Sequence, residues 1–257
     1  MSVLKADHIT IKFGGLTAVS NFCLTIKEGE LLGLIGPNGA GKTTTFNILT
    51  GVYKPTSGKN YFYGQDTTIM RVDQIAALGV GRTFQNIRLF SELSVIDNVM
   101  LGSHVHLETS VFQVFFHTPQ YMRKEEQIRE EAMQLLSELH LDKFKNKIAG
   151  SLPYGEQRRL EIARALATKP KLLLLDEPAA GMNPQESKDL MNFIRKIQDD
   201  FNLTILLIEH DMKVVMGICR RILVMDYGVT IAEGNPREIQ NNPEVIKAYL
   251  GVDASYA

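Results

Sequence analysis

A glycine-rich segment has the residue types and the spacing needed to hold a phosphate group. Residues 36–43 read Gly-Pro-Asn-Gly-Ala-Gly-Lys-Thr. The apolar stretch 31–35 before it predicts a strand, and a helix is predicted to follow as far as about Leu49. Glycines let successive N–H groups face one anion, and a helix N-terminus adds positive charge. We expect Lys42 to reach the β- and γ-phosphates of a nucleotide and the Thr43 hydroxyl to bind Mg²⁺. A glycine-rich turn with a chance lysine would not require this order of strand, loop and helix.

Two adjacent acids follow a run of leucines later in the chain. Residues 172–175 predict a buried strand, and Asp176 and Glu177 come directly after it. A carboxylate at the C-terminal end of a central parallel strand lies at the ligand edge of the sheet. We expect Asp176 to hold Mg²⁺ through water and Glu177 to act as general base on the attacking water. The alternative is a pair of acids that only caps the strand before the turn at Pro178.

Alternating strands and helices must position these groups. The pattern predicts strands within 2–35, at 59–63, 171–175, 203–208, 222–225 and 229–232, and helices at 156–168, 184–200 and 211–219. This order is typical of an α/β fold with a mostly parallel sheet covered on both faces. Between about 86 and 149 the strand pattern gives way to helix. One helical face there carries five apolar side chains: Ile128, Ala132, Leu135, Leu136 and Leu139. The apolar patch 110–116 is either a short core helix or a docking surface.

Bulk properties exclude some classes of protein. The chain has 257 residues, enough for one core with an inserted subdomain, and its formal net charge of −1 provides no basic field for nucleic acid. No stretch approaches the roughly 20 apolar residues of a membrane-spanning helix, so we expect a cytoplasmic location. The two cysteines, Cys23 and Cys219, have no metal-ligand spacing, and both are expected to be buried.

A segment shortly before the paired acids resembles the signature loop of ABC ATPases, whose usual form is Leu-Ser-Gly-Gly-Gln. It reads Ser-Leu-Pro-Tyr-Gly-Glu-Gln-Arg-Arg-Leu over residues 151–160. It keeps three family positions and departs from two: Leu152, Gly155 and Gln157 are kept, while Pro153 and Tyr154 stand where Ser and Gly are usual. Other classes of phosphate-loop ATPase do not carry this element.

The remaining elements of that family appear in the expected order. Gln85 resembles the Q-loop glutamine that reaches Mg²⁺, and His210 resembles the switch histidine that contacts the γ-phosphate. Phe13 resembles the aromatic residue that stacks on adenine, although a single phenylalanine could equally be a core residue. Residues 179–183 occupy the D-loop, where Asn183 replaces the usual Asp.

The resemblance implies a P-loop NTPase (ABC ATPase) core with an N-terminal antiparallel β subdomain and an inserted α-helical subdomain. Residues 1–257 would form a single domain, with 1–85 and 156–257 as the core and β subdomain and 86–155 as the helical subdomain with the signature loop. The implied cofactors are ATP and Mg²⁺. The implied catalytic residues are Lys42, Gln85, Glu177 and His210. The implied nucleotide contacts are Phe13, Gly36, Pro37, Asn38, Gly39, Ala40, Gly41, Lys42, Thr43, Thr44, Leu152, Gly155, Glu156 and Gln157. The implied magnesium ligands are Thr43, Gln85 and Asp176.

Longer sequence segments indicate which branch of the family the chain resembles. Residues 13–19, 81–86 and 152–166 look like the ATPase subunit of bacterial branched-chain amino acid importers, and the long insert at 104–126 suits it. The ATPases of urea or amide importers and of the lipopolysaccharide exporter remain alternatives. ABC ATPases of translation or DNA repair are a further alternative, but they usually carry two cassettes or a long coiled coil.

The resemblance also implies partners and a place in the cell. The expected partners are a second ABC ATPase subunit, identical or not, the integral membrane permease subunits and, indirectly, a substrate-binding protein, with no nucleic acid. The chain would lie on the cytoplasmic face of the cell membrane. Arg88 and Phe90 are candidates for the groove that docks on the permease, whereas Leu93 and Val95 are expected to pack inside the helical insert.

Overall fold

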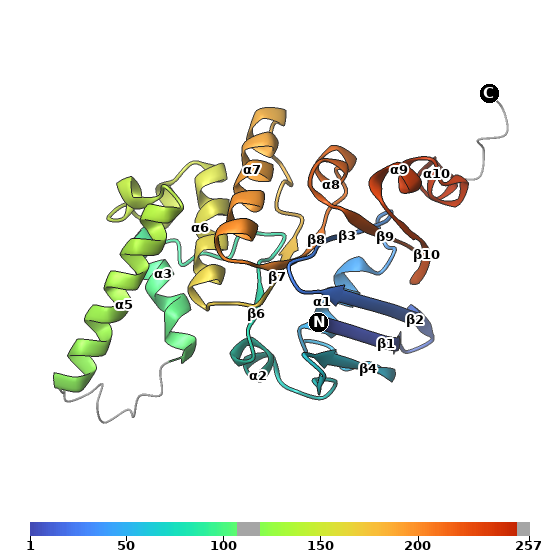
Figure 1. Ribbon diagram of the computed structural model, residues 1–257, viewed down its shortest axis with the longest axis horizontal. Coiled ribbons are helices and arrows are strands. Elements are labelled where there is room, and N and C mark those ends of the chain that lie inside the picture. The colour runs from blue at the N-terminus through green and yellow to red at the C-terminus, as the bar shows by residue number, and fades with distance from the viewer. Residues whose placement is uncertain (107–118, 251–257) are drawn as a thin grey trace. The chain divides into compact units, whose positions relative to one another are not determined.

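The computed structural model describes residues 1–106 and 119–250, although not the side chains of residues 106, 119 and 120 (Figure 1). The apolar patch predicted at 110–116, and with it the middle of the predicted insert, lies outside the described residues. The chain divides into two compact units, one formed by residues 1–82 and 171–257 and the other by residues 83–170. We call them the core unit and the helical unit.

A six-stranded sheet runs through the core unit in the order β10-β9-β3-β8-β7-β6. All neighbouring strands are parallel except β10, which is antiparallel to β9. The strands are β3 (Leu31–Ile35), β6 (Val80–Arg82), β7 (Leu172–Asp176), β8 (Thr204–Ile208), β9 (Arg221–Asp226) and β10 (Val229–Gly234). Every residue of β3, β7 and β8 is buried, which explains their continuous apolar sequences. Their C-terminal ends meet at one edge of the sheet, where ligands bind in such folds.

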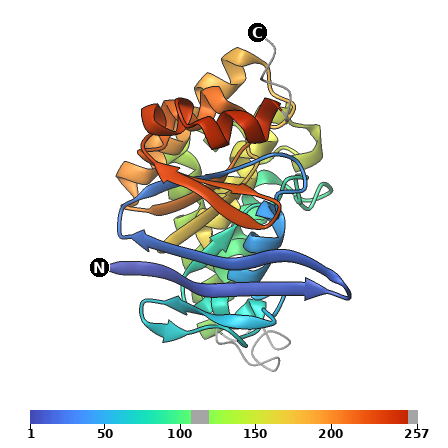
Figure 2. The same cartoon turned by 90° about the vertical axis from the view of Figure 1, so that its right-hand side faces the viewer.

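A second sheet of four antiparallel strands has the order β2-β1-β4-β5. Its strands are β1 (Ser2–Phe13), β2 (Leu16–Lys27), β4 (Ser57–Phe62) and β5 (Gln65–Asp66), and Figure 2 shows the long β1–β2 pair. The antiparallel β subdomain is therefore confirmed. Phe22 and Leu24 are buried, whereas Cys23 between them is exposed, so the prediction that Cys23 is buried was wrong. Successive side chains of a strand alternate between faces, and Cys23 falls on the outer one. Cys219 is buried as predicted.

Helices cover both faces of the six-stranded sheet, as the sequence predicted (Figure 1). Helix α1 (Lys42–Leu49) contributes Phe46, Ile48 and Leu49 to a hydrophobic core that also contains side chains of both sheets. Helices α7 (Pro184–Asp200) and α8 (Met212–Ile218) pack together on the other face. The core unit also contains three short helices that the sequence analysis did not predict: α2 (Val72–Ala77), α9 (Pro236–Gln240) and α10 (Pro243–Leu250).

In the part of the helical unit that the structure describes, the longer helices are α3 (Val95–Ser103), α5 (Pro119–Glu138) and α6 (Tyr154–Ala167). The described residues between and after these helices also form short 3₁₀ segments, namely η1 (His104–His106), which follows α3, and η2 (Asp142–Phe144) and η3 (Ala149–Ser151), which lie between α5 and α6. Helix α3 packs against both α5 and α6. A Cβ atom on Gly102 of α3 would lie 2.3 Å from the Arg164 carbonyl oxygen, so glycine permits the close approach of α3 to α6. The predicted apolar face is confirmed on α5 by the burial of Ile128, Ala132 and Leu136, while Leu135 is half-buried. Leu139 is also buried but lies in the turn that follows the helix.

Two expectations about the helical unit differ from the structure. Helix α6 belongs to the unit 83–170 because it packs against α3, whereas the predicted boundary placed residues from 156 onward in the core. Val95 is fully buried as predicted, but Leu93 is 38% exposed, so its predicted packing inside the insert was wrong. Leu93 precedes Ser94, the N-cap of α3, and therefore lies in a turn and not on the buried helix face. Within the described residues, no helix is both long enough and apolar enough to cross a membrane.

Candidate functional site

The loop between β3 and α1 has the geometry of an anion cradle. Gly36 and Gly41 have φ angles of 152° and 97°, a region that favours glycine. A Cβ atom on Gly36 would lie 2.1 Å from the Met225 carbonyl oxygen, and one on Gly41 would lie 2.7 Å from that of Ala18. Helix α1 begins without a side-chain cap and without an acidic residue in its first turn. Its N-terminal amides can therefore serve an anionic ligand.

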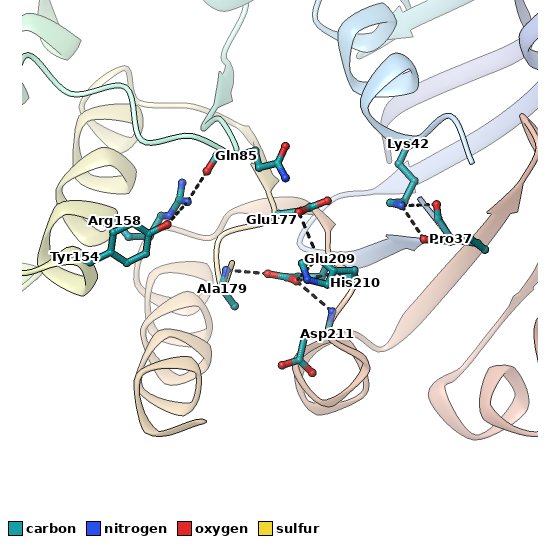
Figure 3. A network of polar contacts seen from close by, with 11 residues as sticks. Pro37, Lys42, Gln85, Tyr154, Arg158, Glu177, Ala179, Glu209, His210 and Asp211 are labelled. Atoms are coloured by element: carbon teal, nitrogen blue, oxygen red, sulfur yellow. Dashed lines mark hydrogen bonds and ion pairs between the residues drawn. The ribbon is translucent and has the colours of Figure 1, made fainter. Parts of the chain in front are cut away.

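A buried lysine supplies the positive charge of this loop. Lys42 is 6% exposed, and its Nζ donates hydrogen bonds to the carbonyl oxygens of Gly36 (2.7 Å) and Pro37 (2.9 Å) (Figure 3). Burial lowers the pKa of the Lys42 ammonium, while the charges of Glu177 and Asp176 oppose this effect. Thr43, next to Lys42, is exposed, and Thr44 is half-buried. A buried cation beside a glycine cradle fits the phosphates of a nucleotide.

Asp176 ends β7 and forms an ion pair that the sequence analysis did not anticipate. Its Oδ2 lies 3.1 Å from a terminal nitrogen of Arg82, and both side chains are nearly inaccessible to solvent. The Arg82 guanidinium also donates to Asn47 (2.8 Å) and Thr50 (3.0 Å) of α1. Arg82 thus joins the strand that carries the paired acids to the helix that follows the phosphate loop. No sequence motif marked it, because its partners are 32 to 94 residues away.

Glu177 and His210, far apart in the sequence, meet at the same sheet edge. Glu177 follows β7 and His210 follows β8, and these two strands are neighbours. The His210 Nδ1 lies 3.3 Å from the Glu177 Oε2 (Figure 3). The Glu177 side chain is 11% exposed and that of His210 is 53% exposed, so a carboxylate and an imidazole are paired at a solvent-accessible edge. This arrangement places a carboxylate, a group that can accept a proton, next to an imidazole.

Phe13 lies at the end of β1, where its side chain can receive a ligand. Phe13 is 45% exposed, and its ring packs edge-on against Tyr53 with centroids 5.3 Å apart. The alternative that Phe13 is a core residue is therefore not supported. Tyr53, which packs against the Phe13 ring, was not predicted from the sequence.

In the helical unit, the backbone around Gln85 is held by a buried ion pair from α6. The Arg158 guanidinium donates to the carbonyl oxygen of Gln85 at 2.7 Å (Figure 3) and to that of Phe84, also at 2.7 Å. It also pairs with Glu161 at 2.7 Å, and the two side chains are 0% and 1% exposed. Glu161 in turn accepts hydrogen bonds from the N–H groups of Phe84 (3.4 Å) and Arg88 (3.1 Å). This Arg158–Glu161 pair fixes the segment 84–88, in which Gln85 is an exposed residue.

The signature-like loop precedes α6. Leu152 is buried, and Pro153 is the N-cap of α6, with its carbonyl oxygen accepting from the N–H groups of Glu156 and Gln157 (both 3.0 Å). A Cβ atom on Gly155 would meet no heavy atom within 4 Å. The Gln157 side chain turns back on its own loop, donating to the Leu152 carbonyl oxygen at 2.8 Å. Gly155 is half-buried, with open space where a side chain would lie, so a ligand or a partner can approach there, while Gln157 stabilises the loop.

The D-loop lies in the core unit between β7 and α7. The Asn183 side chain caps α7, accepting from the N–H groups of Gln185 (2.9 Å) and Glu186 (3.0 Å). Asn is one of the preferred N-cap residues, so the departure from Asp retains the cap.

Comparisons with known proteins agree with this geometry. The family model described as "ABC transporter" matches residues 19–180, and one described as "Branched-chain amino acid ATP-binding cassette transporter" matches residues 229–255. The chain is 48% identical to the high-affinity branched-chain amino acid transport ATP-binding protein BraF of Pseudomonas aeruginosa, covering 97% of this chain and 98% of BraF. It is 34% identical to the lipopolysaccharide export system ATP-binding protein LptB of Escherichia coli, covering 98% and 99% of the two chains.

Solved structures show the same fold. The ADP conformation of MJ1267, an ATP-binding cassette of an ABC transporter, matches with a TM-score of 0.86 at 31% identity, over 98% of this chain and all of that one. A dimeric post-hydrolysis state of the cassette MJ0796, bound to ADP and Pi, matches with a TM-score of 0.75 at 28% identity, over 91% and 99% of the two chains. The chain therefore belongs to the ABC transporter family as one of its ATP-binding proteins, and its activity is the hydrolysis of ATP.

Proposed function

We propose that this chain powers an importer of branched-chain amino acids. The observation that carries the proposal is the 48% identity to BraF over nearly the whole of both chains, compared with 34% to LptB. The C-terminal match at residues 229–255 supports the same branch of the family independently, because it lies outside the general ABC match. The lipopolysaccharide exporter is the less favoured alternative.

The phosphate loop and the sheet edge take the roles that ATP hydrolysis requires. Lys42 neutralises the β- and γ-phosphates, and the backbone of residues 36–41 with Thr44 surrounds them. Glu177 accepts the proton of the attacking water, and His210, 3.3 Å from Glu177, contacts the γ-phosphate. Phe13 stacks on the adenine through its exposed ring face.

Thr43, Asp176 and Gln85 carry oxygen donors of the kinds that Mg²⁺ accepts. Thr43 supplies an exposed hydroxyl, Asp176 a carboxylate at the strand end, and Gln85 an exposed amide from the helical unit. Hydroxyl, carboxylate and amide oxygens are the ligands that Mg²⁺ accepts together with phosphate oxygens and water. The ion supplies charge neutralisation of the phosphates when it is bound.

The working form is a dimer of ATPase subunits, identical or not. The signature loop of one subunit covers the ATP held by the other, with the open face at Gly155 and the N-terminus of α6 directed at the γ-phosphate. Leu152, Glu156 and Gln157 support that loop. The dimer of MJ0796 with ADP and Pi supports this assembly. Permease subunits are the further partners, and the chain works at the cytoplasmic face of the membrane that holds them.

Transport assays test the proposed substrate. The gene is deleted in its native host, and uptake of radiolabelled leucine, valine and urea is measured before and after complementation. We expect leucine and valine uptake to fall and to return with the wild-type chain but not with Lys42→Ala. Unchanged leucine uptake together with a loss of urea uptake, or with a defect in lipopolysaccharide export, would contradict the proposal.

A further inference from the structure

The buried carboxylate of Glu209 lies next to the Glu177–His210 pair. Glu209 is 0% exposed, and it precedes His210 in the segment that follows β8. One of its oxygens accepts from the Ala179 N–H at 2.8 Å, and the other accepts from the N–H groups of His210 (3.1 Å) and Asp211 (3.4 Å) (Figure 3). The two oxygens therefore join two stretches of chain that are separated by 30 residues.

The joined stretches are those that carry Glu177 and His210. The Glu177 N–H donates to the Ile208 carbonyl oxygen at 2.9 Å, which ties the turn after β7 to the end of β8. The bond from Ala179 to Glu209 ties the same turn a second time, two residues further on. Glu177 has a φ angle of 45°, a left-handed conformation that a non-glycine residue keeps only when its surroundings impose it. The second tie holds the turn in this conformation.

A glutamate suits position 209 better than a glutamine, which has the same shape, because both carboxylate oxygens of Glu209 accept hydrogen bonds from backbone N–H groups. Burial raises the pKa of the Glu209 carboxyl, while the hydrogen bonds from Ala179, Asp211 and His210 oppose the rise. Burying such a group is unfavourable unless its oxygens are paired. Glutamine has the same shape but only one acceptor oxygen, so its NH₂ group would face a backbone N–H in either orientation. Aspartate keeps both oxygens but is shorter by one methylene group.

We propose that Glu209 is a positioning residue that fixes the Glu177 carboxylate relative to the His210 imidazole. This inference rests on the proposed function, which gives those two side chains their roles in hydrolysis. Glu209 is fully buried and acts through the backbone on either side of the reacting groups, and its Oε2 also lies 3.9 Å from the His210 Nδ1. Its loss therefore lowers the rate of the chemical step and leaves nucleotide affinity unchanged, since the phosphate loop is held by other contacts.

The experiment measures ATP hydrolysis by the full-length chain with Mg²⁺ for Glu209→Gln, the wild type, Lys42→Ala and a matched control. Glu30→Gln is the control because the Glu30 carboxylate also accepts from a backbone N–H, that of Lys27 (2.8 Å), and pairs with Arg221 (3.0 Å). For Glu209→Gln we expect kcat to fall by about 10- to 100-fold with KM for ATP within about twofold, as for displaced catalytic groups. Faster amide exchange over residues 177–183 should accompany the loss. Glu30→Gln should keep the wild-type kcat and KM.

Wild-type kcat in Glu209→Gln, or a rise in KM that accounts for the whole loss, would overturn the inference. If Glu209→Gln does not fold, the same measurement on Glu209→Asp decides: a smaller fall in kcat at unchanged KM supports the inference, and wild-type kcat overturns it. A wild-type chain that does not hydrolyse ATP, or an active Lys42→Ala variant, would instead contradict the proposed function.

Discussion

The phosphate loop of the core unit and the segment around Gln85 in the helical unit are held in place in different ways. The phosphate loop is shaped by its own residues: glycines at 36 and 41 adopt positive φ angles, and Lys42 donates to two carbonyl oxygens five and six residues earlier. The segment 84–88 is shaped by Arg158 and Glu161, side chains more than 70 residues away. One loop is thus encoded locally and the other depends on a distant ion pair.

This difference predicts how the two regions respond to substitution. Loss of the Lys42 side chain removes a ligand contact directly and leaves the fold intact, because its hydrogen bonds lie within the loop itself. Changes to the Arg158–Glu161 pair leave charged groups buried without a partner, and the fold of the helical unit suffers first.

Replacement of Lys42 should have the largest effect on hydrolysis. Lys42→Ala removes the fixed cation that neutralises the phosphates, so we expect hydrolysis to fall at least about 100-fold, with weaker nucleotide binding. Thermal unfolding should change little, since the Lys42 bonds lie within the loop itself. Phosphate release and nucleotide binding by the purified variant check this. Hydrolysis at the wild-type rate would mean that the loop does not hold the reacting phosphates.

Glu177→Gln should separate binding from chemistry in the core unit. Glutamine keeps the shape of the side chain but cannot accept a proton, so we expect a loss of at least about 100-fold in hydrolysis with ATP binding retained. Unhydrolysed ATP should then hold two subunits together. Size-exclusion chromatography with ATP and Mg²⁺ should show the dimer, and ADP serves as the control nucleotide. A monomer with normal turnover would reassign the general base.

The same contrast between local and distant contacts explains which features of the fold and the site could be predicted from the sequence. The phosphate loop, the paired acids and His210 were predicted because each depends on local residue types or on its place after a strand. The exposure of Phe13 agrees with the expected stacking position. Arg82, Glu209 and the Arg158–Glu161 pair were missed, because their partners become visible only when the sheet order and the helix packing are known. The exposure of Cys23 was predicted wrongly because the prediction relied on the general tendency of free cysteines to be buried. In a strand, the alternation of side chains between the two faces determines which residues are exposed.

Arg158→Met should mainly reduce stability. Methionine fills part of the space but leaves Glu161 buried without its cation, which costs about 3–5 kcal/mol in comparable cases. The loss should appear in the free energy of urea unfolding and as faster amide exchange over residues 84–88. Arg129→Met on the exposed face of α5 is the control, expected to change stability by less than about 0.5 kcal/mol. Equal effects of the two substitutions would show that the buried pair does not hold this segment.

Gly155→Asp should spare the fold and block the dimer. No heavy atom would lie within 4 Å of a Cβ at this position, and a negative charge near the start of α6 favours the helix. In the partner-facing site, however, the same charge repels the γ-phosphate, so the ATP-held dimer of the Glu177→Gln variant should weaken by about tenfold or more. Pro153→Ser, which restores the usual family residue, is the tolerated control. A normal dimer with Gly155→Asp would mean that this loop does not cover ATP.

Phe90→Ala should have the smallest and most selective effect. Phe90 is 52% exposed, and its ring is covered on one side by the Arg164 guanidinium at 5.6 Å, so the exposed side is available to a permease. We expect uptake of radiolabelled leucine by the assembled transporter to fall about fivefold, which corresponds to about 1 kcal/mol of docking energy. ATP affinity should not change, because Phe90 belongs to the helical unit and the phosphate loop to the core unit. Phe90→Tyr keeps the ring and should retain uptake. Unchanged uptake with Phe90→Ala would show that this surface does not dock on the permease. A loss of ATP binding would show instead that the phosphate loop of the core unit depends on contacts in the helical unit.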